Sequence, residues 1–217
     1  MDRDTAYEFF EKGALVAGMR GAFGPETALA ATSILMEEGI HVFELTMNSD
    51  DPIEAMQAVK REFGDAACVG MGTVLNTEDA QRVLDAGADF VVSPAFQPDV
   101  VQVINDAGVL MAPGVITPSE AVAAWEMDCK LLKIFPIGAL GINYFKAVFG
   151  PLNHMKFMCN GGMHAENAGQ FLNAGAVACG MASWLTGDGH MSVDTIRNRA
   201  RQLHAAINAA KGVPRTV

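Results

Sequence analysis

The sequence predicts an α/β fold built on a parallel sheet, and three features of the 217-residue chain support this. Half of the residues are hydrophobic and no tract is of low complexity, so the chain can bury a sizeable core. Short β-rich runs recur roughly every 25 residues and alternate with segments of helical spacing. Four of those runs directly follow a glycine, the residue that commonly ends a helix in the left-handed conformation: Gly39, Gly87, Gly108 and Gly175.

In chain order, the pattern predicts an N-terminal helix near 4–11, eight strand–helix units and a last helix near 194–210. Two helix starts are marked by a capping side chain, Asn76 before Thr77 and Thr117 before Pro118. The strands are expected to begin near eight positions: Ala14, Ile40, Ala66, Asp89, Val109, Lys130, Met155 and Ala176.

Eight units of this length predict a small (β/α)8 TIM barrel with an N-terminal helix. An open doubly wound sheet is the alternative, because spacing does not prove closure. No linker divides the chain, so we expect a single domain over residues 1–217.

The composition narrows the classes of partner. Fifteen basic and 25 acidic side chains give a net charge of −10, which disfavours a broad nucleic-acid surface but allows a local anion pocket. The charged start at Met1-Asp2-Arg3-Asp4 lacks the apolar core of a secretion signal, and no apolar run is long enough to span a bilayer. The four cysteines form no C-x-x-C pair. We therefore expect a cytoplasmic protein with no membrane or nucleic-acid partner.

Two charged residues, Glu44 and Lys133, interrupt strands that are otherwise apolar. Active sites of this fold lie at the carboxyl ends of the strands, so inward polar residues there are candidates for chemistry. Residues two apart on a strand share a face. The alternation therefore groups Lys133 with Phe135, and on the third strand it groups Thr73 with Met71.

A buried charge is energetically costly unless it is paired or has a function, so we consider three interpretations of Glu44 and Lys133. They form a structural ion pair, or Lys133 faces solvent between helices, or they are catalytic. In the catalytic interpretation, a partly apolar pocket favours the neutral amine of the lysine, which attacks carbonyls to form a Schiff base. A nearby carboxyl group moves the protons that carbinolamine formation and carbon–carbon cleavage require. This pair therefore suggests a metal-free aldolase.

A phosphate site is expected where the predicted seventh and eighth strands end, at Gly161-Gly162 and at Ser183. The loops after these two strands, with backbone N–H groups at a helix start, commonly bind phosphate in a barrel. A plain tight turn is the alternative for Gly161-Gly162. The histidines lack metal-ligand spacing and no full G-x-G-x-x-G is present, so we expect no metal and no cofactor.

Several strand-end segments together resemble those of one enzyme family. In chain order they are residues 15–21 (LVAGMRG), 43–46 (FELT), 70–76 (GMGTVLN), 93–94 (SP), 113–120 (PGVITPSE), 133–136 (KIFP) and 161–162 (GG). From about Ala14 to Leu185, the chain resembles the class I 2-keto-3-deoxy-6-phosphogluconate (KDPG) aldolases, with their 6-phosphogalactonate and 4-hydroxy-2-oxoglutarate aldolase relatives.

The resemblance implies a homotrimer of TIM barrels that cleaves KDPG to pyruvate and glyceraldehyde 3-phosphate. It implies that Lys133 forms the Schiff base and that Glu44 moves protons, including the proton of the C4 hydroxyl. The remaining implied contacts bind substrate: the pyruvyl carboxylate at Arg20 and Thr73, the walls of the pyruvyl pocket at Pro94 and Phe135, and the phosphate at Gly161, Gly162 and Ser183.

Three positions depart from the family pattern. Asn48 stands where many members have an arginine, Asn160 where a threonine or similar residue is expected, and Ala182 where glycine is usual. The alanine Cβ would crowd a phosphate if that site needs a positive φ. The alternatives are therefore an aldolase for 4-hydroxy-2-oxoglutarate or another 2-keto-4-hydroxy acid, oxaloacetate decarboxylation, or a non-catalytic barrel that binds a phosphorylated sugar acid.

Overall fold

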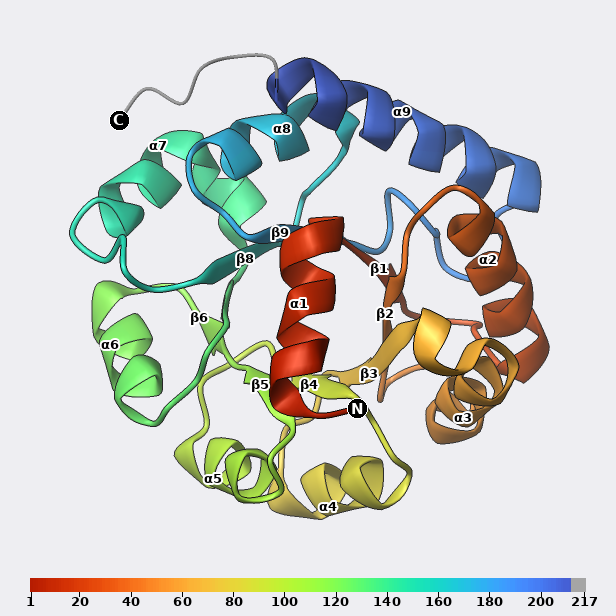
Figure 1. The fold of residues 1–217 in the computed structure, drawn as a ribbon, viewed down its shortest axis with the longest axis horizontal. Coiled ribbons are helices and arrows are strands. Elements are labelled where there is room, and N and C mark those ends of the chain that lie inside the picture. Colours follow the sequence, from red (N-terminus) through yellow and green to blue (C-terminus); the bar gives the residue numbers. More distant parts are fainter. Residues whose placement is uncertain (212–217) are drawn as a thin grey trace.

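The structure is a computed structural model that describes residues 1–211, and it shows parallel strands ringed by helices (Figure 1). The strands are β1 (Leu15–Met19), β2 (Val42–Thr46), β3 (Cys68–Gly72), β4 (Phe90–Val92), β5 (Leu110–Ala112), β6 (Gly114–Val115), β7 (Leu132–Ile134), β8 (Phe157–Asn160) and β9 (Ala178–Met181). The helices are α1 (Arg3–Gly13), α2 (Pro25–Glu37), α3 (Pro52–Phe63), the 3-10 turn η1 (Gly64–Ala66), α4 (Thr77–Asp85), α5 (Pro98–Asp106), α6 (Pro118–Glu126), α7 (Ile137–Phe149), α8 (Ala165–Asn173) and α9 (Val193–Lys211).

The sheet closes into a barrel through β5 and β6. Neighbouring strands pair in the order β5-β4-β3-β2-β1-β9-β8-β7-β6, so the two ends of the sheet are consecutive segments of the chain. Only Pro113 separates them, and a proline has no N–H to contribute to the strand ladder. Its carbonyl still accepts a hydrogen bond from the Lys133 N–H at 2.9 Å. The predicted TIM barrel is confirmed, and the open doubly wound alternative is wrong.

Eight of the nine strands begin one or two residues after a predicted start, as at Val42 instead of Ile40. The short β6 was not predicted, because it continues the predicted fifth strand beyond Pro113. The first apolar residue after the glycine belongs to the helix end, because its N–H bonds back to the helix. Ile40, for example, donates to the Leu35 carbonyl at 2.9 Å. The predicted first and last helices are confirmed as α1 and α9.

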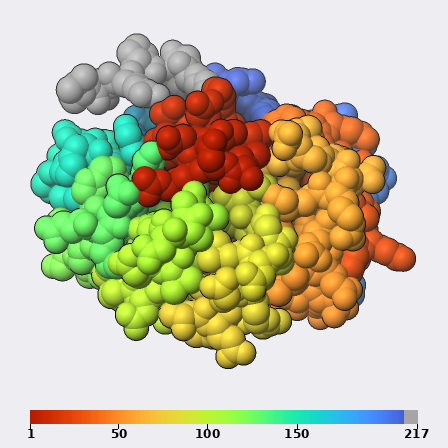
Figure 2. Space-filling model, turned by 60° about the horizontal axis from the view of Figure 1, so that its bottom comes forward, coloured from red at the N-terminus to blue at the C-terminus, as the bar shows by residue number. Residues whose placement is uncertain are grey.

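Helix α1 fills the end of the barrel at which the strands begin (Figure 1). Figure 2 shows its side chains seated among those of the surrounding segments. Phe10 is fully buried and meets Phe90 edge to face, with 4.9 Å between ring centroids. The same cluster holds the inward residues of the lower barrel, among them Val16, Val42 and Leu131. Side chains of the described residues therefore fill this end of the barrel, and an open cavity lies at the opposite end, where the strands finish.

A second core lies between the outer face of the strands and the surrounding helices. It includes the residues that alternate with the inward ones, such as Phe43 and Leu45 on β2. Helix α9 lies between α8 and α2 and completes the ring (Figure 1). No helix within residues 1–211 is both long enough and apolar enough to cross a membrane.

Candidate active site

A cavity of about 280 Å³ opens at the carboxyl ends of the strands. This is the end at which barrel enzymes place their chemistry. The nine residues predicted for the site all line it: Arg20, Glu44, Thr73, Pro94, Lys133, Phe135, Gly161, Gly162 and Ser183. Residues spread over more than 160 positions of sequence (20 to 183) thus share one concave surface.

Lys133 of β7 and Glu44 of β2 meet inside the barrel mouth. The Lys133 Nζ lies 3.6 Å from the Glu44 Oε1, and their side chains are only 8% and 6% exposed. The ammonium group also lies 5.1 Å from the centroid of the Phe135 ring. The interpretation in which Lys133 faces solvent is therefore wrong. The two groups form an ion pair, and because both line the cavity a bound molecule can reach them.

Gly72 makes room for the Glu44 carboxylate from the neighbouring strand β3. A Cβ at position 72 would lie 2.0 Å from the Glu44 Oε1, far inside any allowed contact. The absence of a side chain at Gly72 is thus a condition for the observed place of the carboxylate. Strand β3 therefore contributes to the site through Gly72, which leaves the space that the Glu44 carboxylate occupies.

Thr73 reaches the cavity by a turn of the backbone. Strand alternation groups it with Met71, but Met71 packs outward against the helices. Thr73 follows the last residue of β3 and has a φ of 62°, which is rare for a β-branched residue. This conformation brings Thr73 to the cavity while Met71 stays outside. The expected common face is wrong at this position, although the predicted site residue is placed in the cavity.

The turn after β8 has two consecutive glycines in the left-handed region, Gly161 with a φ of 83° and Gly162 with a φ of 78°. The Gly161 carbonyl accepts a hydrogen bond from the Gly138 N–H at 2.8 Å, which ties the turn to the start of α7. Helix α8 begins three residues later, at Ala165. A glycine turn that leads into a helix N-terminus is suited to bind an anion.

Ser183 follows β9 and lies beside Arg20, which follows β1. The Arg20 Nη2 donates to the Ser183 Oγ at 3.5 Å. The backbone next to Arg20 is held by the Ser49 hydroxyl, which accepts from the Gly21 N–H at 3.1 Å. The guanidinium thus lies near the expected phosphate end of the cavity. Asn48 is exposed and does not line the cavity.

Asn160, noted only as a departure in the sequence, is a buried residue of the cavity wall. Its side-chain oxygen has no hydrogen-bond partner among the described residues. Gly180 on β9 leaves the space for this amide, because a Cβ there would lie 2.2 Å from the Asn160 Nδ2. Alternation along β8 places Asn160 on the face of inward Met158, and this signal could have identified it.

Ala182 does not have a positive φ, so the expected strain at this position is absent. Thr46, the last residue of β2, also lines the cavity, and strand alternation places it on the face of Glu44. Sequence reasoning missed wall residues that lie beyond strand ends: Met163, His164 and Trp184. Only their proximity to strand ends marks them in the sequence.

The KDPG and KHG aldolase family model matches residues 16–199 of the chain. The chain belongs to this family. A probable 2-dehydro-3-deoxy-6-phosphogalactonate aldolase of Rhizobium meliloti is 32% identical over 91% of this chain and 93% of its own. A structure described as native KDPGal superposes with a TM-score of 0.87 at 30% identity, over 92% of this chain and 96% of that one.

A KDPG aldolase of Legionella pneumophila, with pyruvate captured as a covalent carbinolamine, superposes with a TM-score of 0.80 at 25% identity. That match covers 94% of this chain and 97% of the other. As a member of the KDPG and KHG aldolase family, the chain is a class I aldolase, an aldehyde lyase. The substrates of the family are pyruvate and phosphorylated 2-keto acids.

Proposed function

We propose that this aldolase cleaves 2-keto-3-deoxy-6-phosphogluconate to pyruvate and glyceraldehyde 3-phosphate through a Schiff base on Lys133. The observation that carries the proposal is the contact between Lys133 and Glu44, 3.6 Å apart within the cavity. A buried amine beside a buried carboxylate provides the nucleophile and the proton carrier that the reaction needs.

Glu44 first takes a proton from the Lys133 ammonium, and the neutral amine attacks the C2 carbonyl to form the carbinolamine. Glu44 gives this proton to the carbinolamine hydroxyl, which leaves as water and yields the protonated Schiff base. Glu44 then takes the proton of the C4 hydroxyl. The C3–C4 bond breaks, its electron pair moves to the iminium as an enamine, and C4 leaves as the aldehyde. Glu44 returns the proton to C3, and water releases pyruvate and the free amine. One carboxyl group thus serves as base and then as acid.

We assign the two ends of the substrate to different walls of the cavity. We assign the pyruvyl carboxylate to Thr73, with Pro94 and Phe135 as apolar walls. The phosphate is assigned to the other side, at the glycine turn and Ser183. Arg20 lies against Ser183, and this contact favours a charge-assisted bond to phosphate over the carboxylate contact that the resemblance implied.

The phosphogalactonate substrate is a second candidate, favoured by the relatives of high coverage that carry that name. It differs from the gluconate compound at C4 and gives the same two products. A comparison of kcat/KM for the two compounds separates these candidates. A third arm with 4-hydroxy-2-oxoglutarate measures the dependence on phosphate, and equal values for all three substrates would contradict a phosphate site.

Borohydride trapping tests the mechanism. Reduction in the presence of pyruvate should leave one pyruvyl group on Lys133, located by intact mass and peptide mapping. Lys133→Met should abolish the adduct and lower kcat by about four orders of magnitude. Lys146→Met, which removes an exposed lysine of α7, is the matched control and should retain both. An adduct on another lysine, or none on folded protein, would contradict the proposal.

We further propose that the aldolase is a cytoplasmic homotrimer, as the resemblance implies. All four cysteines are free and buried, which suits a reducing compartment. Leu75 and Leu140 are exposed apolar side chains, 43% and 47%, that an interface could cover. Sedimentation equilibrium should give three times the mass of one chain, and a monomer at micromolar concentration would contradict the trimer.

A further inference from the structure

The turn between β9 and α9 forms one wall of the active-site cavity. Ala182, Ser183 and Trp184 all line it. The N–H groups of Leu185 and Thr186 close the turn on the Ala182 carbonyl, at 2.9 and 2.8 Å. The Thr186 hydroxyl also donates to the Gly18 carbonyl of β1 at 2.5 Å. These bonds hold both ends of the turn, but none of them holds Trp184 at its centre.

Arg199 of α9 makes the contacts that hold Trp184. Its Nη1 donates to the Trp184 carbonyl, and its guanidinium carbon lies 5.5 Å from the centroid of the indole ring. The same Nη1 lies 3.4 Å from the Met191 sulfur, farther along the segment that leads to α9. One side chain thus binds both the backbone and the ring of a single cavity residue.

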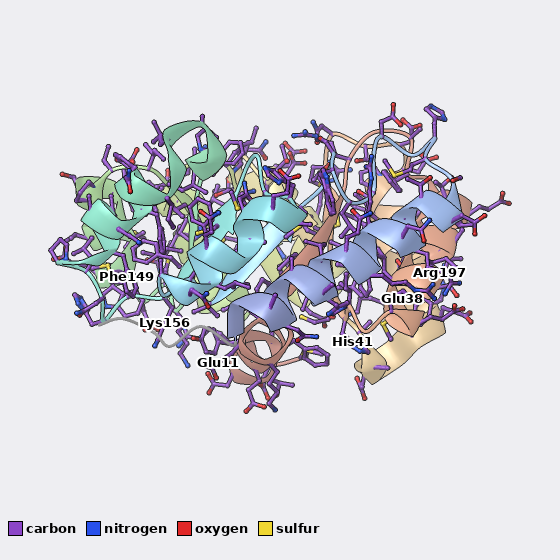
Figure 3. The ribbon with its side chains drawn as sticks, turned by 90° about the horizontal axis from the view of Figure 1, so that it is seen from above. Glu11, Glu38, His41, Phe149, Lys156 and Arg197 are labelled. Carbon is purple, nitrogen blue, oxygen red and sulfur yellow. The ribbon has the colours of Figure 1, made fainter. Side chains whose placement is uncertain are left out.

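The neighbouring arginines of α9 have a different task. Arg197 binds Glu37 and Glu38 at 2.7 and 2.9 Å, and Arg201 binds Glu38 at 2.8 Å. Figure 3 shows Arg197 beside Glu38. No carboxylate of the described residues forms an ion pair with Arg199. Its partners, Trp184 and Met191, both belong to the segment between β9 and α9. Arg197 and Arg201 therefore fasten α9 to the end of α2, whereas Arg199 fastens the turn.

We propose that Arg199 is a positioning residue for substrate binding. It fixes the turn so that Ser183 and Trp184 face the phosphorylated end of the substrate. A turn held in its binding conformation loses little freedom when the anion arrives, so the contacts it makes are stronger. The contacts of Arg199 are with Trp184 and Met191, not with Lys133 or Glu44, so we assign it no part in the bond-breaking step. The inference rests on the proposed function and deepens it by assigning the support of the phosphate end.

Kinetics of matched variants test the proposal. Arg199→Met should raise the KM for KDPG about tenfold while kcat changes little, because the bond-breaking groups are untouched. The pyruvate concentration that half-saturates borohydride trapping at Lys133 should not change. Arg199→Lys, which keeps a cation and a donor, should recover part of the loss. Arg197→Met, which removes an ion-pairing arginine of the same helix, is the control and should keep the wild-type KM.

A KM for KDPG that is the same in Arg199→Met and Arg197→Met would overturn the proposal. The proposal would also be overturned if Arg199→Met raised the pyruvate concentration that half-saturates trapping by the same factor as the KM for KDPG. The effect would then not be confined to the phosphate end. If the wild-type chain traps no pyruvate and cleaves no KDPG, the proposed function fails instead, and the spectroscopic test below still decides on Arg199.

Fluorescence provides a readout that needs no turnover. The chain has two tryptophans, so Trp125→Phe leaves Trp184 as the single tryptophan, which excitation beyond the tyrosine absorption band selects. In that background, Arg199→Met should shift the emission to longer wavelength and weaken its response to added inorganic phosphate. Arg197→Met should do neither. Identical spectra and phosphate responses for the two arginine variants would show that Arg199 does not position the turn.

Discussion

Glu44 and Lys133 are charged side chains among apolar inward neighbours, and each offsets the cost of burying the other. Removing one partner of such a pair leaves an uncompensated charge, which is strongly unfavourable. The structural ion-pair interpretation is therefore compatible with the catalytic interpretation, and the proposed chemistry would use a pair that also contributes to stability. What distinguishes it from an ordinary buried ion pair is the open cavity above it.

Replacement of Glu44 by glutamine tests the proton carrier with little change of shape. Glu44→Gln should lower kcat by about 10²- to 10³-fold, because the amide cannot accept the C4 hydroxyl proton. Pyruvate release followed in a coupled assay measures the effect. Glu54→Gln, an exposed site on α3, is the control and should keep the wild-type rate. Wild-type kcat in Glu44→Gln would remove Glu44 from the mechanism.

The cysteines should be unreactive in the native protein. Burial raises the pKa of Cys129 and of Cys179 to about 12. It also raises the pKa of Cys68 and of Cys159. The thiolate fraction of Cys129 and Cys179 at pH 8 is then only about 10⁻⁴. Ellman's reagent should modify no cysteine of the folded chain and all four after unfolding in guanidinium.

A cysteine introduced at exposed Ser119 is the positive control for this assay, and Ser119→Cys should react at once. Fast modification of a native cysteine at the same pH would mean that the chain opens locally at that site.

At the scale of elements, α6 shows how local sequence fixes the start of a helix. Thr117 and Glu120 form a capping box, and the Glu120 carboxylate accepts from the N–H groups of Thr117 and Ile116 at 2.8 and 2.9 Å. Both N–H groups lack partners within the helix, so the carboxylate satisfies them. Only Ile116 and Thr117 separate β6 from the first turn of α6, and the Glu120 carboxylate binds the N–H groups of both.

The capping box predicts a pH-dependent stability. The hydrogen bonds from Thr117 and Ile116 lower the pKa of Glu120 below its usual 4.5. The ionised Glu120 carboxylate therefore contributes its full stabilising free energy above pH 4.5. This contribution is lost as the pH falls through the lowered pKa. Glu120→Gln should destabilise the chain by about 1 kcal/mol at pH 7, and the difference from wild type should shrink below pH 4.5.

Urea unfolding of both proteins at several pH values measures this difference. Glu126→Gln, at the other end of α6, is the control and should cost no stability. A Glu120→Gln effect that is equal at pH 7 and in acid would mean that charge is not the cause.

At the scale of the whole molecule, α1 closes one end of the barrel and leaves the other for chemistry. Phe10→Ala removes a fully buried ring that packs on Phe90, and we expect it to lower the free energy of unfolding by about 3–5 kcal/mol. The kcat of the folded variant should remain close to wild type, because the site lies at the opposite end. Urea unfolding and steady-state kinetics measure the two effects.

Phe9→Ala is the matched control, since this neighbouring ring is only partly buried and should cost much less. A large loss of kcat in folded Phe10→Ala would mean that the two ends of the barrel are coupled.

The sequence by itself determined the order of strands and helices, the eight strand–helix units and nine of the residues that line the cavity. It could do so because periodicity, glycine at helix ends and charges within apolar strands are local signals. Charges within apolar strands marked Glu44 and Lys133 as candidates, although one of the three interpretations left Lys133 facing solvent. The resemblance added the substrate contacts, and the cavity contains all of them.

Only the tertiary structure decided which distant groups meet. It closed the barrel at Pro113, turned Thr73 to the cavity against the strand alternation, and set Arg20 beside Ser183. It also brought Arg199 to Trp184 from the last helix. These outcomes depend on the backbone conformation at single residues and on packing between segments far apart in the chain. Local sequence patterns do not predict these contacts. Periodicity indicates which face of a strand or helix a residue occupies, but not which distant residue packs against that face.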